Sequence, residues 1–478
     1  MLISLFGVCL LSLGSFVHSP ADSSRRDSLE RVVVQSVSIV GNARTRDRII
    51  GRELALQAGD TLTQAQLTRQ LELDRQKVVN TNLFITVAVQ ANEVVDSAVT
   101  TPAELKKVAV RVVVKEQWYL LGFPTFSLAD RNFNEWWYER GRSLKRTIYG
   151  VYVSYQNLTG NNDRLRLVAE LGFVPRLELS YSLPYLDKKQ RTGISVGMSY
   201  INNRTIAYRT RNDKLLFLNS EDRTRERFVP SVGITHRRNF YGFHSLGLAY
   251  SITQIADTIA RINPNYFLEN RTKQNFAQLT YTYFYDRRDR AQYPLRGHFY
   301  AFQASRTGLL ASDDWQQWDS YGFGALFVPL GKKWFSSFYG EAKGSLVDKQ
   351  PFLQTRGLGY GGDLVRGYEL YVIDGQHYTY FRSNLRYQLI NRTFNLKFIK
   401  IKQFNTFPLA VYPNVYLDAG YVWNRFPELN NSKLANQLLV GGGVGLDFVF
   451  WYNFVARINY SVNRMGEARP YFSIGREF

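Results

Sequence analysis

The chain has 478 residues, which is enough for two or three ordinary domains or one very large one. It carries 60 lysines and arginines against 40 aspartates and glutamates, a formal charge of +20, which favours an anionic partner or a solvated basic surface. No zinc-finger, RNP-type or helix-turn-helix pattern is present, so nucleic acid is not an expected partner. Aromatic residues make up 15% of the chain, a bias typical of β structure.

The first 21 residues are similar to a secretory signal peptide. An apolar run from Leu2 to Val17 leads into small residues around Pro20, although no Lys or Arg precedes the run. The alternative is an N-terminal membrane anchor, for which this run is short. Cys9 is the only cysteine, so a cleaved chain would contain neither a disulfide nor a cysteine metal site. No later stretch approaches 18 consecutive apolar residues, so the exported chain is either soluble or crosses a membrane as a β-barrel.

Residues 33–116 show the periodicity of a small α/β domain. Thr61 or Thr63 can cap the second of two helices. The predicted order is strand, helix, helix, strand, strand, at residues 32–42, 47–56, 61–79, 83–89 and 108–114. This region resembles a POTRA domain, the periplasmic polypeptide-binding module of outer-membrane assembly and secretion barrels. The matching residues are Gly41-Asn42, Thr45, Arg52-Glu53, Gly59-Asp60, Leu83-Phe84 and the closing VVVKE. An unrelated small α/β fold is the alternative.

From residue 117 to residue 478 the period of the pattern changes to two. In RTGISVGMSY, Ile194, Val196, Met198 and Tyr200 share one face and small residues share the other. FHSLGLAYSI, NFAQLTYTYFYD and FVARINYSVN alternate in the same way. One face of each predicted strand is therefore apolar and aromatic, and the other is small or polar.

A soluble β-sandwich also alternates, but three features favour a transmembrane barrel. The segments recur over about 360 residues, enough for about 16 tilted strands. Tyr, Phe and Trp gather near the ends of the predicted strands, as membrane interfaces require. The chain ends RPYFSIGREF, and terminal Phe478 resembles the C-terminal signature of bacterial outer-membrane barrels, although Arg476 interrupts its apolar face. We predict a membrane all-β protein, with a 16-stranded antiparallel barrel over residues 117–478.

The alternation stops at GLGYGGDLVRGYEL, residues 357–370. Its Gly357, Gly359 and Gly362 match G-x-G-x-x-G, but a nucleotide-binding loop requires a following helix and none is predicted. We interpret the segment as a long connection between two barrel strands, because glycines let the backbone fold back. A loop of this size over a wide barrel can turn into the lumen.

Val365, Arg366, Gly367 and Tyr368 form a VRGY element. It resembles the V-R-G-[FY] element of the BamA/TamA-like outer-membrane assembly superfamily, the bacterial surface antigen family. In that family the loop folds into the barrel, and its arginine contacts acidic residues on the inner wall. In NVYLDAGYVW, alternation points Tyr416, Asp418 and Gly420 inward and Leu417 outward, within a stretch that resembles the family's F-x-D-x-G motif. The resemblance implies that Asp418 is the partner of Arg366; an ordinary arginine in a solvated loop is the alternative.

The sequence leaves the strength of this contact open. In a water-filled lumen the ion pair would contribute under ~1 kcal/mol. Breaking it in a dry contact would cost ~3 kcal/mol or more. Family members often carry a glutamate on the strand after the loop, where this chain has Asn384 or Arg386. Since asparagine carries no charge, we expect the loop to be held more weakly or in a different arrangement.

A third match is YDRRDRAQYPLRGHFY. Its Asp286, Arg288, Asp289, Pro294 and Gly297 follow the family's D-x-R-D…P-x-x-G strand–turn–strand pattern. Proline and glycine suit a turn. The alternative is a plain charged hairpin.

No catalytic constellation is evident. The five histidines show no metal-ligand spacing, and no G-x-S-x-G or P-loop is present, so we expect neither enzymatic activity nor a cofactor. The resemblance implies a bacterial outer-membrane protein that inserts barrels or translocates polypeptides. Its implied partners are unfolded outer-membrane or secreted polypeptides, outer-membrane lipid or lipopolysaccharide, and accessory periplasmic proteins or lipoproteins.

Two other functions remain open. A dedicated two-partner-type secretion pore usually has two POTRA domains and an N-terminal plug helix, and neither is evident in the sequence. A passive porin or surface-structural barrel needs no POTRA domain, so residues 33–116 argue against it.

Overall fold

The computed structural model describes residues 31–94, 106–187, 191–220, 222–239, 241–290, 293–347, 349–395, 406–450 and 454–475. The chain divides into two compact units, with the boundary between Trp118 and Tyr119. The predicted signal peptide with Cys9, and the terminal Arg476 and Phe478, lie outside the described residues.

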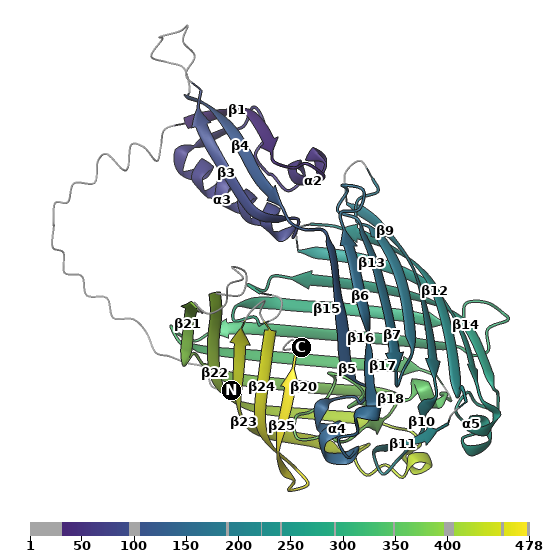
Figure 1. Cartoon of the computed structure of the whole chain (residues 1–478). Helices are drawn as coiled ribbons and strands as arrows, with labels where there is room; N and C mark the ends of the chain where they lie inside the picture. The colour runs from purple at the N-terminus through teal and green to yellow at the C-terminus, as the bar shows by residue number, and fades with distance from the viewer. Residues whose placement is uncertain are drawn as a thin grey trace, which may run out of the picture. The chain divides into compact units, whose positions relative to one another are not determined.

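The N-terminal unit is a four-stranded sheet with two helices (Figure 1). Its elements are β1 (Arg31–Val40), α2 (Asp47–Gly51), β2 (Thr61–Thr63), α3 (Gln64–Asn80), β3 (Phe84–Glu93) and β4 (Lys106–Glu116). The strand order is β2-β1-β4-β3, with β1 parallel to β4 and the other pairs antiparallel. The predicted order of strands and helices is therefore present, with the short β2 added between the helices.

The helices of this unit follow from local chemistry. Thr63 caps α3, because its side chain accepts from the Gln66 N–H while the Gln66 side chain accepts from the Thr63 N–H. The first helix ends at Gly51 instead of the predicted residue 56. The buried Asp74 carboxylate accepts from the N–H groups of Ala55 and Leu56 at 2.8 and 3.0 Å, so these groups do not continue the helix. The core of the unit consists of Val32, Val34, Leu56, Leu67, Val108 and Val110.

The end of β4 closes this unit. Glu116, the last residue of VVVKE, accepts from the N–H and the hydroxyl of Thr45, both at 2.6 Å. Gly41 has φ +97°, and a Cβ there would lie 2.0 Å from the Val114 carbonyl oxygen. Only glycine fits this close approach between the first turn and the last strand.

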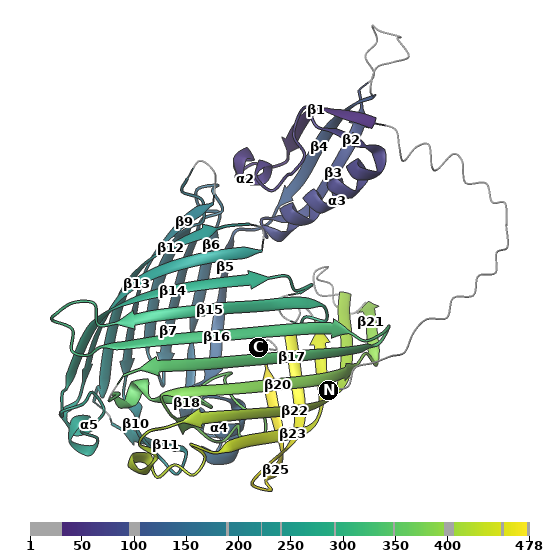
Figure 2. The same cartoon turned by 180° about the vertical axis from the view of Figure 1, so that it is seen from behind.

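The C-terminal unit is a closed antiparallel barrel (Figures 1 and 2). Its described strands are β5 (Leu120–Leu128), β6 (Thr147–Gln156), β7 (Arg164–Gly172), β8 (Arg176–Leu183), β9 (Thr192–Asn203), β12 (Arg225–Arg237), β13 (Gly242–Ile255), β14 (Lys273–Asp286), β15 (Gly297–Thr307), β16 (Gln317–Pro329), β17 (Trp334–Leu346), β20 (His377–Tyr387), β21 (Ile390–Asn395), β22 (Thr406–Trp423), β23 (Leu438–Phe450), β24 (Phe454–Asn463) and β25 (Ala468–Ile474).

In the described part of the chain, these seventeen strands make sixteen passes of the wall. Consecutive β20 and β21 both pair with β22, along residues 414–423 and 406–411, so they form one interrupted strand. The strand order closes with β9 beside β12 and β25 beside β5. The sixteen-stranded antiparallel barrel of the sequence analysis is confirmed.

The two faces of the wall also follow the predicted alternation. Val196, Leu248 and Tyr460 are exposed to between 44% and 51%, as side chains that face lipid should be. In β22, the predicted inward residues Tyr416 and Asp418 are 6% and 0% exposed. Their neighbour Leu417 is 60% exposed, on the opposite face.

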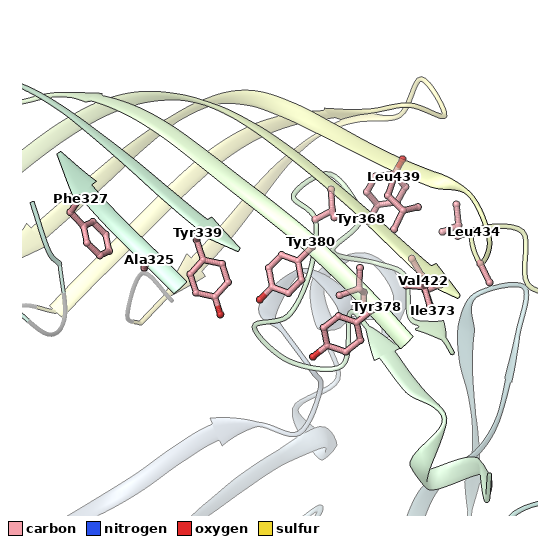
Figure 3. Close-up of a cluster of buried hydrophobic side chains, with 13 residues drawn as sticks. Ala325, Phe327, Tyr339, Tyr368, Ile373, Tyr378, Tyr380, Val422, Leu434 and Leu439 are labelled. Atoms are coloured by element: carbon pink, nitrogen blue, oxygen red, sulfur yellow. The ribbon is translucent and has the colours of Figure 1, made fainter. Parts of the chain in front are cut away.

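Short elements occupy the connections between strands. They are α4 (Phe133–Glu139), η1 (Leu144–Arg146), β10 (Thr205–Arg211), β11 (Lys214–Asn219), α5 (Asp257–Ile262), η2 (Phe352–Gln354), β18 (Arg356–Leu358), β19 (Ile373–Asp374) and η3 (Pro427–Asn430). Within the described ranges, no helix has the length and apolar character needed to cross a membrane. A buried cluster on the inner wall joins strands β16, β17, β20, β22 and β23 to the connection between β17 and β20 (Figure 3).

Candidate functional site

The site is built around the lumen loop, residues 359–372 between β18 and β19. The two short strands pair and close its base. At its start, Gly359 has φ +90°, and a Cβ there would lie 2.1 Å from the Tyr371 carbonyl oxygen. At the VRGY element, Gly367 has φ +97°, and the Tyr368 N–H donates to the Val365 carbonyl at 3.1 Å. The element therefore forms a tight turn that depends on glycine.

Arg366 and Asp418 are in direct contact. The Arg366 Nε and Nη2 donate to the two Asp418 carboxylate oxygens at 2.7 and 2.5 Å, and the Arg366 backbone N–H donates to Oδ2 at 3.1 Å. The guanidinium also lies 3.8 Å from the centroid of the Tyr416 ring. The side chains of Arg366 and Asp418 are 15% and 0% exposed. The contact is therefore largely buried, and it is a bidentate ion pair of the strong kind.

Two glycines in the wall make room for the loop. A Cβ at Gly420 would lie 2.6 Å from the Val365 side chain, and a Cβ at Gly441 would lie 1.8 Å from the Arg366 carbonyl oxygen. Val365 is 1% exposed as a result. The sequence prediction singled out Gly420 but missed Gly441, which lies in the run LLVGGGVGLDF of β23.

Strand β20 completes the docking of the loop. Of the two candidate wall residues, Asn384 and Arg386, Asn384 contacts the loop, and its side-chain oxygen accepts from Arg366 Nη1 at 2.6 Å. Arg382, on the same face of β20, donates through Nε to the Leu364 carbonyl at 2.9 Å. Strand β20 thus supplies a neutral acceptor for Arg366 and a second arginine that donates to the loop backbone.

A carboxylate does lie nearby, on the strand before the loop, and sequence reasoning missed it. Glu341 of β17 accepts from the hydroxyls of Tyr339, Tyr378 and Tyr380 at 2.6, 2.7 and 3.0 Å. Figure 3 shows these three tyrosines beside the docked loop. The cross-strand pairing of Glu341 with Tyr380 places them together, and only the register between β17 and β20 reveals it.

The strand–turn motif forms the connection between β14 and β15. Arg288 donates to Asp286 at 2.7 Å, and the Asp289 carboxylate accepts from the N–H groups of Leu295 and Arg296 at 3.0 and 3.2 Å. Gly297 has φ +101°, and a Cβ there would lie 2.1 Å from the Arg287 carbonyl oxygen. Pro294 is buried beside these residues. The motif residues therefore hold their own turn together.

Tyr293, next to Pro294, connects this turn to strand β23 of the barrel wall. The hydroxyl of buried Tyr293 donates to Asp447 of β23 at 2.8 Å. Asp447 also lies 3.6 Å from Arg386 and 3.7 Å from Arg457, and accepts from Asn414. Nothing in the local sequence pattern distinguished Asp447, because its partners come from four separate strands and turns.

A cavity of 720 Å³ connects these groups to the seam between the first and last barrel strands. Phe126, Ser127 and Leu128 of β5 line it, as do residues 471–474 of β25. Arg366 and Arg382 line its inner side. Among the described residues, no group of three or more His, Cys, Asp or Glu side chains is arranged to hold a metal ion.

A closed barrel with a lipid-facing apolar surface, a buried loop in its lumen and a small α/β unit before it defines a transmembrane barrel of the outer-membrane class. Two family models match the chain. The Omp85 superfamily domain matches residues 157–478, and the POTRA model described as "Surface antigen variable number repeat" matches residues 32–117. The chain therefore belongs to the Omp85 superfamily, whose members serve outer-membrane insertion or translocation. It lies in the outer membrane, with its POTRA domain in the periplasm.

Solved structures agree with this fold. BamA from Haemophilus ducreyi, in a form lacking POTRA domains 1–3, is similar with a TM-score of 0.58 and 16% identity, over 93% of this chain and 84% of that one. CdiB from Escherichia coli has a TM-score of 0.55 and 14% identity, over 94% and 76%. By sequence, no curated protein matches the chain. At these identities the similarity establishes the fold alone.

Proposed function

We propose that this chain inserts other barrels into the outer membrane or translocates polypeptides across it. The POTRA domain would capture an unfolded outer-membrane or secreted polypeptide, and the seam between β25 and β5 would template its strands. Outer-membrane lipid or lipopolysaccharide would surround the barrel, and accessory periplasmic proteins or lipoproteins would deliver substrate. The mechanism requires no cofactor and no enzymatic step.

The observation that carries the proposal is the state of the β25 edge. At Pro470 and Phe472, the backbone groups that face the seam are bonded by side chains of α4 instead of by a strand. At these two residues the edge is covered by side chains although the barrel closes with β25 beside β5, and backbone groups that no strand pairs with can accept another chain. The 720 Å³ cavity borders this edge and β5, which leaves space beside it.

The POTRA domain offers a second edge. Strand β2 pairs only with Arg31, Val32 and Val33, so in the described residues the following part of β1 has no strand partner on that side. A groove of 560 Å³ lies along it, lined by residues 37–39 of β1 and by Asp47 and Arg48 of α2. An extended polypeptide can add to such an edge through main-chain hydrogen bonds.

Reconstitution tests the proposal. The chain is placed in liposomes, an unfolded outer-membrane barrel is added, and its folding is followed by heat-modifiable gel mobility. Arg366→Ala and a chain that lacks the residues before 117 are compared with the intact protein. Arg176→Ala is the control, because Arg176 is a wall arginine whose ion pairs with Glu170 and Glu178, at 2.9 and 3.2 Å, lie within β7 and β8.

We expect the intact chain and the control to accelerate folding, and the other two variants to do so less. Acceleration that is equal in all four proteins would refute the roles of the loop and the POTRA domain. No acceleration of several substrates, together with leakage of solutes through a stable pore, would favour a dedicated secretion pore or a passive porin instead.

A further inference from the structure

The short helix α4, in the connection between β5 and β6, holds the edge of the last strand. Asn134 donates through Nδ2 to the Phe472 carbonyl at 3.2 Å and accepts through Oδ1 from the Phe472 N–H at 2.9 Å. The Tyr138 hydroxyl donates to the Pro470 carbonyl at 3.0 Å. The Phe133 ring lies 5.6 Å from the Phe472 ring, edge to face. Figure 1 shows α4 beside β25.

These bonds copy the pairing of a β-strand. Phe472 lies directly opposite Ile458 of β24, and in an antiparallel pair the N–H and C=O of one residue point the same way. Because both groups bond to Asn134, they point away from β24 and toward the seam. A side-chain amide has one donor and one acceptor side, as a peptide group does. Asn134 therefore occupies the site on β25 that the backbone of an incoming strand would use.

Buried charges keep α4 in this position. Glu135 is 1% exposed, and its carboxylate accepts from Arg131 at 2.7 Å and from Arg140 at 3.0 Å. Arg146 donates to Asp130, just before the helix, at 2.6 Å. Burial by itself would raise the pKa of Glu135, but Arg131 and Arg140 outweigh it and hold the pKa below its ordinary value. Ion pairs on both sides of Glu135 therefore hold α4 in place.

The same segment is bonded to the lumen loop. Arg131 donates to the Tyr371 carbonyl at 3.0 Å and also to the Gly359 carbonyl. Asn132, which caps α4, donates to the Glu369 carbonyl at 2.8 Å. The Glu369 carboxylate in turn accepts from the Gly367 N–H of the VRGY element at 2.8 Å. A continuous set of bonds therefore runs from the docked loop through α4 to the edge of β25.

We infer that α4 is a latch, which closes the β25 edge with a side-chain imitation of a strand and releases it when the lumen loop moves. The lumen loop sets the state of the latch, and the latch decides whether the seam can accept a strand. The inference rests on the proposed function only for the identity of the incoming strand. The position of α4 and the opening of the seam are measurable without any substrate.

The test measures the width of the seam in liposomes without substrate. Nitroxide labels are placed at Phe126→Cys on β5 and Ile474→Cys on β25, in a Cys9→Ser background, and the distance distribution is recorded by pulsed electron resonance. Both native side chains are exposed, at 70% and 57%, so the labels disturb little packing. The double variant Asn134→Leu, Tyr138→Phe removes the latch bonds and keeps the size of both side chains. We expect it to raise the ratio of long to short distances about tenfold.

Matched controls use the same substitutions elsewhere. Asn219→Leu alters an exposed residue of β11, and Tyr149→Phe removes a hydroxyl from an exposed tyrosine of β6. Both should leave the distribution unchanged. If Asn134→Leu does not fold, as shown by gel mobility, Tyr138→Phe alone decides, with an expected increase of about threefold. A distribution that is the same in the latch variants and in the controls would overturn the inference.

The link to the lumen loop has its own readout. Asp418→Asn lies outside α4 and β25, and yet it should widen the seam as the latch variants do. Combining it with Asn134→Leu should add little, because both changes release the same element. If the effects of the two changes on the seam distances are fully additive, or if Asp418→Asn has no effect on them, the lumen loop does not control α4 and the coupling is refuted.

Discussion

Asp418→Asn gives the sharpest test of the docked lumen loop. The substitution keeps the shape of the side chain and removes its charge, so Arg366 loses the carboxylate that accepts from its Nε, Nη2 and backbone N–H. Removing one partner of a buried ion pair costs ~3–5 kcal/mol. Arg366 keeps Asn384 and the Ser383 carbonyl as acceptors, which puts the cost near ~3 kcal/mol. At ~1.4 kcal/mol per factor of ten, the undocked loop becomes about 100-fold more populated.

Thiol labelling measures this population directly. Val365 belongs to the lumen loop and is 1% exposed while the loop is docked. Val365→Cys in a Cys9→Ser background therefore reacts with a maleimide only when the loop leaves the wall. When docking is fast relative to labelling, the labelling rate is proportional to the undocked population. We expect Asp418→Asn to accelerate labelling by about 100-fold.

The control is Glu170→Gln, which removes one charge from a wall ion pair with Arg176 on β7 and β8. It should change the labelling rate of Val365→Cys by no more than about twofold. An acceleration below about threefold for Asp418→Asn would show that the Arg366–Asp418 pair does not hold the loop, and would refute the argument from burial.

Three further predictions concern other parts of the chain. Gly441→Ala should accelerate the same labelling, since its Cβ would lie 1.8 Å from a loop carbonyl, while Gly322→Ala, whose Cβ would meet nothing within 4 Å, should not. Asp74→Asn should destabilise the POTRA domain by ~2 kcal/mol. Faster hydrogen exchange across α3 in the full chain would report this loss, with exposed Glu72→Gln nearly neutral. Because the pKa of Glu135 is lowered, its stabilising effect on α4 is complete above the unfolded pKa of ~4.3 and is lost as pH falls below it. The labelled seam should therefore be constant from pH 7 to about 5 and widen as the pH falls below the unfolded pKa of ~4.3, with no such step in Glu135→Gln.

Local pattern was sufficient for most of the barrel. Strict alternation assigns each residue of a strand to one face, which is why Tyr416 and Asp418 could be placed inward and Leu417 outward before any contact was known. The alternation stops at residues 357–370, and the glycines of this segment indicated a loop that folds back. The short first helix was overestimated, because its end depends on the carboxylate of Asp74, which lies 18 residues further along the chain than Leu56.

The sequence by itself determined the division into an α/β segment and a barrel, the faces of the strands, and the candidate pair Arg366 and Asp418. Only the tertiary structure decided which groups complete the site. Asn384 and Gly441 reach the loop through the registers of β20, β22 and β23, and the register of β17 with β20 places Glu341 among three tyrosines of the wall. Asn134 meets Phe472 across 338 residues of chain. Such contacts exist because the barrel closes on itself, and closure brings together first and last strands that share no local pattern.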